Sequence, residues 1–158
     1  MNRRSVSIIA RAGLATGISD FLFACVLSVF FYGSTITRLW QGVAATLLGK
    51  SAFDGGTRTM LIGIVMHFCV AFTWAAVLFL LVTRSAAIRR VLASPFGALK
   101  VASVYGPAIW IVMSVVVIPL LVHRPPTFTL RWLIQGIGHI PFVALPMAAV
   151  IRSDLAKA

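Results

Sequence analysis

The feature that most restricts the fold of this chain is an uncharged apolar run from Met60 to Val82, bounded by Arg58 and Arg84. As an α-helix rising about 1.5 Å per residue, this run is long enough to cross the roughly 30 Å hydrocarbon core of a bilayer. A soluble domain rarely needs such a long apolar helix. The run therefore predicts a membrane-spanning helix.

Three further runs have the same character: 8–32, 101–122 and 132–151. Of the 158 residues, 60% are hydrophobic and only 11% are charged, about half the charged fraction of a typical soluble domain. Backbone polar groups in lipid must be satisfied within their own segment, so each run should be helical. The sequence predicts an all-α membrane protein: a four-helix transmembrane bundle forming a single domain over residues 1–158.

The basic residues indicate an orientation. The formal net charge is +11, but the Lys and Arg residues lie at the ends of the apolar runs, where they anchor helices at the headgroups rather than bind nucleic acid. Five lie in the first and third connections, and nine in the termini and the second connection. The positive-inside rule then predicts that both termini are cytoplasmic. The nine are Arg3, Arg4, Arg11, Arg84, Arg89, Arg90, Lys100, Arg152 and Lys157.

The first connection contains an amphipathic stretch from residue 37 to 49. Its apolar positions, among them Trp40, Ala44 and Leu47, recur at helical spacing, whereas Arg38 lies off that stripe. This pattern predicts an interfacial helix with Trp40 at headgroup level. A helix that tucks into the mouth of the bundle as a lid is the alternative. Three residues are expected to act as interfacial anchors: Trp40, Arg38 and Trp132.

Small residues and prolines predict how the spans pack. Glycines let neighbouring helices approach closely in lipid, and a proline removes one helical hydrogen bond and favours a kink. The expected packing positions are Gly13, Gly17, Gly63, Gly106 and Gly136. The expected kinks are at Pro107, Pro141 and Pro146.

Three titratable residues interrupt the apolar runs: Asp20, His67 and His139. The two histidines each follow the start of their span by seven residues, which places them at similar depth, about 10 Å below the outer surface. Asp20 falls within about 5 Å of that level by the same arithmetic. Lipid would leave these groups unpaired, so we expect them to face inward as a cluster, together with Gln135 and Tyr105.

Three interpretations of this cluster compete. The first is that its hydrogen bonds select which helices pair. The second is a path for protons or a small solute, since Asp, His and Gln beside proline-broken helices are typical of transporters. The third is a b-type haem held by His67 and His139, with no cofactor expected otherwise. No metalloprotease, serine-hydrolase or other catalytic motif occurs, which predicts a protein that is not an enzyme and that has no metal site.

Several short motifs stand out along the chain: Asp20 in a small-residue helix, the segment Leu48–Gly56, His67-Phe68, Arg124-Pro125-Pro126 and His139 followed by Leu145-Pro146. Together they resemble a widespread bacterial group of uncharacterised four-helix inner-membrane proteins. The Ile140-Pro141 pair departs from that pattern. The resemblance covers nearly the whole chain and implies the same topology in a bacterial inner membrane, without an activity.

The sequence thus predicts a multi-pass inner-membrane protein in contact with the lipid bilayer. The leading functional hypothesis is a non-enzymatic structural or accessory subunit, associated with other membrane subunits or with itself. The alternatives are a transporter of protons or small solutes and a haem-containing electron carrier.

Overall fold

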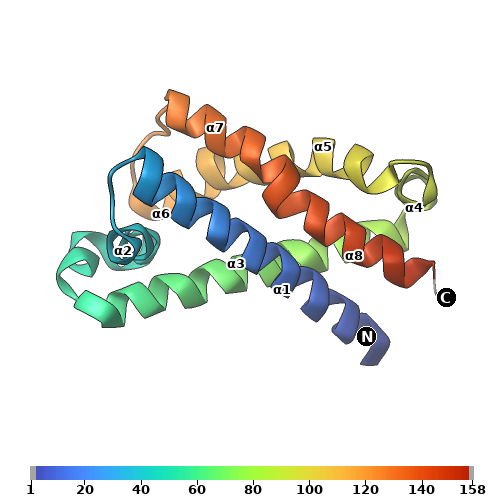
Figure 1. Ribbon diagram of the computed structural model, residues 1–158, viewed down its shortest axis with the longest axis horizontal. Coiled ribbons are helices and arrows are strands. Elements are labelled where there is room, and N and C mark those ends of the chain that lie inside the picture. The colour runs from blue at the N-terminus through green and yellow to red at the C-terminus, as the bar shows by residue number, and fades with distance from the viewer. Residues whose placement is uncertain (1–2, 157–158) are drawn as a thin grey trace.

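The computed structural model describes residues 3–156, so Lys157, counted above, lies outside the described part of the chain. Within 3–156 the protein is helical and contains no β-strand. Four helical stretches are long and apolar enough to cross a membrane: 3–31, 56–84, 97–122 and 130–155 (Figure 1). The all-α bundle predicted from the sequence is confirmed, and each span is a few residues longer at one or both ends than the apolar run alone.

Three of the four spans contain a π-helical segment. The first joins α1 (Arg3–Val26) to η1 (Leu27–Phe31), whereas α3 (Gly56–Arg84) is α-helical throughout. The other two spans are each built from three segments. These are α5 (Gly97–Ile111), η3 (Val112–Val117) and α6 (Ile118–Val122), and α7 (Leu130–Gly138), η4 (His139–Ala144) and α8 (Leu145–Leu155).

Prolines accompany both of the longer π-helical segments. Pro119 follows η3, Pro141 lies inside η4, and Pro146 follows η4. Because proline has no amide hydrogen, the carbonyl four residues before it loses its helical donor, and the local backbone shifts to the wider π pattern. At Pro107, where a kink is expected, α5 continues as an α-helix, and the irregular segment begins only at Val112.

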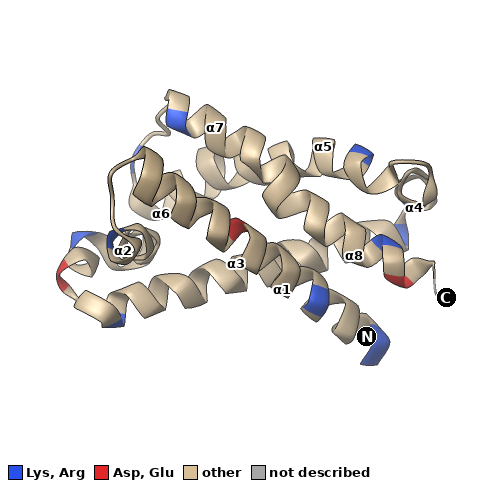
Figure 2. Cartoon of the chain, in the orientation of Figure 1, with Lys and Arg blue, Asp and Glu red and all other residues tan. Residues whose placement is uncertain are grey.

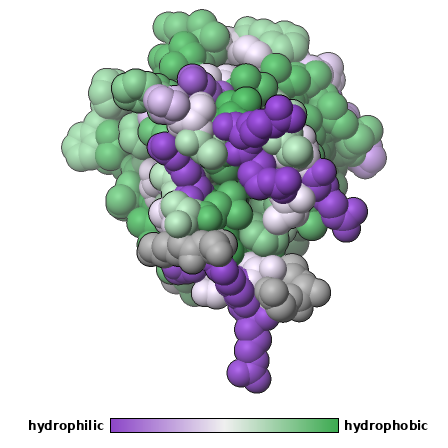
Figure 3. Space-filling model, turned by 90° about the vertical axis from the view of Figure 1, so that its right-hand side faces the viewer, coloured by the Kyte–Doolittle hydropathy of each residue, from purple (hydrophilic) through white to green (hydrophobic). Residues whose placement is uncertain are grey.

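Both ends of the bundle carry basic residues, but the two ends are built from different elements. One end, here called the termini end, carries both chain termini and the short helix α4 (Ala86–Ala93) (Figure 1). The opposite end, here called the α2 end, carries α2 (Ile36–Leu48), the 3-10 helix η2 (Gly49–Asp54) and the 123–129 connection. Basic residues lie at both ends (Figure 2), and they gather into a hydrophilic patch on the termini end (Figure 3).

Helix α2 lies across the end of the spans (Figure 1) and packs against α3. Trp40, predicted to sit at headgroup level, is only 1% exposed, and its ring stacks on Phe21 with centroids 4.6 Å apart. Gln41 Nε2 donates to the carbonyl of Gly56 at 3.1 Å. The side chain of Trp40 therefore faces into the bundle, and not outwards as an anchor at the headgroups would. Arg38 remains exposed, 5.1 Å above the ring of Phe53.

Glycines allow these close contacts. A methyl group on Gly63 would overlap the carbonyl of Trp40, so α2 crosses α3 at this point with their backbones in contact. Gly13 and Gly17 lie under the rings of Phe72 and Phe68 of α3. Gly106 faces the backbone of His139, and Gly136 faces the ring of Trp110. In lipid, where water drives no association, such close packing supplies much of the attraction between helices.

Towards the termini end the four spans enclose an apolar core in which Leu78, Met147 and Ile151 are fully buried. A charged contact closes this end: Arg11 Nη2 lies 2.9 Å from Asp154 Oδ1, and Arg4 Nη2 donates to the backbone oxygen of Asp154 at 2.9 Å. These contacts join α1 to α8, so the first and last spans are neighbours.

We expect Gly63→Ala to destabilise the bundle by about 1–3 kcal/mol, because the new methyl group would overlap a backbone carbonyl that cannot rotate away. Equilibrium unfolding in mixed detergent micelles measures this loss. Gly42→Ala is the matched control: no atom lies within 4 Å of a β-carbon at Gly42, so helix propensity should stabilise α2 by up to about 1 kcal/mol. Equal stabilities of the two variants would contradict the close crossing.

Candidate functional site

The main cavity of the protein is a chamber of about 660 Å³ between the four spans, on the side of the α2 end. Its volume falls within the roughly 300–1,000 Å³ typical of small-molecule sites. Most of its wall is apolar, with a few polar side chains among the lining residues. Those polar residues are Thr16, Asp20, Thr46, His67 and Gln135, together with His139.

The chamber opens sideways, towards the position that lipid would occupy. Leu47 of α2, Val65 of α3 and Leu121 of α6 line it, and they are 60%, 62% and 45% exposed. A residue that both lines a cavity and is exposed marks its mouth. The opening therefore lies between α2, α3 and α6.

The floor of the chamber is closed. Trp74, Ile109 and Val143 line its inner end, and the apolar core fills the bundle from there to the termini end. Tyr105, expected in the polar cluster, belongs to this core and donates its hydroxyl to the carbonyl of Trp74 at 2.8 Å. Tyr105 does not line the chamber, so the expectation that it joins the polar cluster is corrected.

Asp20 and His67 are neighbours across α1 and α3. The distance from His67 Nδ1 to Asp20 Oδ2 is 3.8 Å, and His67 Nε2 lies 2.9 Å from the carbonyl oxygen of Gly17. A carbonyl only accepts hydrogen bonds, so Nε2 carries the proton and donates. In the neutral ring, Nδ1 is then an acceptor that faces the carboxylate.

His139 completes the cluster from η4. Its Nδ1 lies 2.7 Å from the carbonyl of Gln135, so Nδ1 carries the proton, and Nε2 of the neutral ring is an acceptor. Asp20 lies within electrostatic range of both imidazoles. The structure therefore brings together four of the five predicted residues, Asp20, His67, His139 and Gln135, around one chamber.

Aromatic rings flank both histidines. The ring of Trp40 lies 5.0 Å from that of His67, and the ring of Trp110 lies 4.8 Å from that of His139. Trp132, expected as an interfacial anchor, packs against Trp110 at 6.0 Å and donates from Nε1 to Ser114 Oγ at 3.0 Å. Trp132 thus ties α7 to η3.

The two histidines do not present the geometry of axial haem ligands. Such ligation needs an unprotonated nitrogen from each ring directed across a common slot. His67 Nε2 is engaged by Gly17, and its Nδ1 faces Asp20, so neither nitrogen of His67 is free to ligate iron in this arrangement. In residues 3–156, no group of three or more His, Cys, Asp or Glu side chains is close enough to hold a metal ion.

Sequence reasoning missed the role of Thr16. Its hydroxyl is 1% exposed and donates to the carbonyl of Val143 at 2.9 Å, which joins α1 to η4 at the edge of the chamber. The only sequence signal is its place among the small residues of α1, four positions before Asp20.

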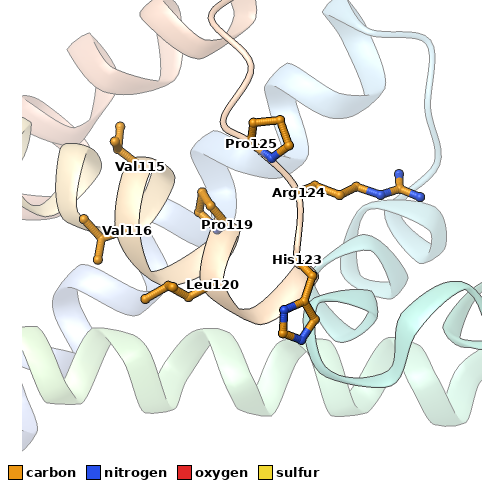
Figure 4. Close-up of a pocket in the computed structure, with 7 residues that line it drawn as sticks. All are labelled: Val115, Val116, Pro119, Leu120, His123, Arg124 and Pro125. Atoms are coloured by element: carbon orange, nitrogen blue, oxygen red, sulfur yellow. The ribbon is translucent and has the colours of Figure 1, made fainter.

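A second recess, of about 490 Å³, lies at the surface where α6 meets the 123–129 connection. Figure 4 shows the guanidinium of Arg124 directed away from the apolar side chains of Val115, Val116, Pro119 and Leu120. Because its polar groups do not converge, this recess is a weaker candidate site than the chamber.

The fold and the chamber define a class: a four-helix membrane-type bundle with an interior, laterally open cavity. Comparison with known protein families, with curated proteins and with solved structures finds no match to this chain.

We predict that the two chamber histidines hold opposite neutral tautomers, protonated at Nε2 in His67 and at Nδ1 in His139. Nitrogen-15 NMR of histidine-labelled protein in micelles distinguishes the two forms. His123, exposed in a connection, serves as a reference that averages over both tautomers. Two chamber histidines with the same tautomer would show that one of the carbonyl contacts is not formed.

Proposed function

We propose that this protein is a non-enzymatic membrane protein that binds a lipophilic small molecule, taken from the surrounding bilayer into the chamber. The observation that carries the proposal is the combination of an apolar wall, a mouth beside lipid and converging polar groups inside. A molecule dissolved in the membrane meets the mouth at Val65 and Leu121 without passing through water.

The closed floor distinguishes this function from that of an open pore. A pore needs a polar route to both sides of the membrane, whereas the bundle beyond Trp74 is filled by apolar side chains. The chamber therefore binds from one side. A carrier would require a rearrangement of the core, but binding requires none.

We further propose a multi-pass location in a bacterial inner membrane with both termini in the cytoplasm. Eight described basic residues lie at the termini end, against five at the α2 end. This asymmetry supports the orientation through the positive-inside rule. In that orientation the chamber lies in the outer half of the bilayer.

The binding proposal is tested with azioctanol, a neutral photoreactive alcohol, on the full-length protein in phosphatidylcholine vesicles. After illumination, mass spectrometry should locate most of the label on residues that line the chamber, including Met66 and Trp110. Val65→Trp, which narrows the mouth, should reduce this labelling severalfold.

Leu61→Trp is the matched control, because Leu61 is 53% exposed on the same helix but does not line the chamber. Labelling of the chamber in Leu61→Trp should match that in the unmodified protein. Label spread evenly over the lipid-facing sides of all four spans, with no effect of Val65→Trp, would overturn the proposal.

The orientation is tested by cysteine accessibility in intact cells, in a background where Cys25 and Cys69 are replaced by alanine. A membrane-impermeant maleimide should label Ser51→Cys in η2 and should not label Ala87→Cys in α4, since these exposed positions lie at opposite ends. The reverse pattern would invert the topology. Permeabilised cells, in which both should react, provide the control.

A role as an accessory subunit is a second candidate. Phe30, Phe31 and Phe128 are 79%, 71% and 66% exposed at the α2 end, and such aromatic side chains suit a contact with another membrane subunit. Co-purification from native membranes in mild detergent tests this role. Loss of a stoichiometric partner in Phe30→Ala would support it.

A further inference from the structure

We infer that the ligand of the chamber is a lipophilic amine in its cationic, ammonium form, an inference that rests on the proposed binding function. The argument starts from the hydrogen-bonding character of the three titratable groups. It then uses the distribution of charge around the chamber and the nature of its walls.

The titratable groups present acceptors to the chamber. The Gly17 carbonyl holds the proton of His67 on Nε2, and the Gln135 carbonyl holds that of His139 on Nδ1. The remaining nitrogen of each neutral ring is therefore a lone-pair acceptor, and an ionised Asp20 has only acceptors. His67 Nδ1 and Asp20 Oδ2, which lie 3.8 Å apart, are then both acceptors, and an ammonium group has enough N–H groups to donate to each of them.

The distribution of charge around the chamber also favours a cationic ligand. Asp20 is the sole acidic residue among the described residues of the lining, and neither Lys nor Arg contributes to it. The nearest opposite charge inside the bundle would come only from a protonated histidine. A carboxylate that is shielded from water is costly unless a cation or a proton accompanies it. A cationic ligand supplies that charge.

The walls suit the rest of such a molecule. Trp40, Trp74 and Trp110 all line the chamber, and the face of an indole attracts a cation. The mouth between α2, α3 and α6 is apolar, so an alkyl or aryl tail can lie there and extend towards lipid. The Gln135 side-chain amide can donate or accept and does not exclude this occupant.

The test uses three single-chain molecules that differ only in the head group: dodecylammonium, dodecanol and dodecanoate. Each competes with azioctanol for the chamber in phosphatidylcholine vesicles, with concentrations expressed as mole fractions in the bilayer to remove differences in partitioning. We expect dodecylammonium to protect the chamber at a mole fraction at least about tenfold lower than dodecanol, because a hydrogen bond with a charged partner is stronger than a neutral one. Dodecanoate should protect least.

Asp20→Asn should remove the advantage of the amine, so that dodecylammonium and dodecanol protect the chamber at similar mole fractions. Asp54→Asn is the matched control, since Asp54 is exposed in η2 and outside the chamber. If the Asp20 variant does not fold, the ranking on the unmodified protein still decides the inference.

The outcomes separate the two proposals. Equal protection by dodecylammonium and dodecanol, or stronger protection by dodecanoate, would overturn the inference and leave the binding function standing. Failure of azioctanol to label the chamber at all would overturn the binding function itself. An amine advantage that persists in Asp20→Asn would also contradict the inference, because it would place the cation elsewhere.

Discussion

The structure depends on the need to satisfy every backbone polar group without help from water. In the described chain this need makes each span a helix, and several hydrogen-bonding side chains of the spans bond to backbone carbonyls inside the bundle. The carbonyls of Gly17, Trp74, Gln135 and Val143 each accept a hydrogen bond from a side chain. Three of these four bonds join different spans. The carbonyls of Gly17 and Gln135 fix the tautomers of His67 and His139. Backbone geometry therefore decides which ring nitrogen of each histidine is a hydrogen-bond acceptor.

The chamber results from uneven packing along the bundle. Towards the termini end, small and medium-sized side chains fill the space between the spans, and the Arg11–Asp154 contact ties the first span to the last. Towards the α2 end, α2 crosses α3 at Gly63 and packs Trp40 against Phe21 and His67. Beside this aromatic cluster the space between the spans remains unfilled.

The spans were predictable from the sequence because the thickness of a bilayer fixes the length of an apolar run. The grouping of Asp20, His67 and His139 was also predictable, since counting residues from each helix end gives depth. The sequence does not show which face of its helix carries Tyr105, so its place in the core was missed. The burial of Trp40 was also missed, because an apolar stripe does not show whether its residues face lipid or other helices. The π-helical segments depend on which carbonyls find donors in three dimensions, which a single sequence does not specify.

The two connections that flank α2 each contain a glycine that affects how this helix meets the bundle. Gly33 and Gly49 lie on either side of this helix with φ values of 61° and 68°, in the left-handed region where side chains with a β-carbon are strained. Both glycines are surrounded by open space. The angle at which α2 enters the bundle thus depends on two backbone joints near its ends as well as on its contact with Gly63. Because α2 lines the mouth of the chamber, a change at either joint would alter the chamber without replacing any residue of its wall.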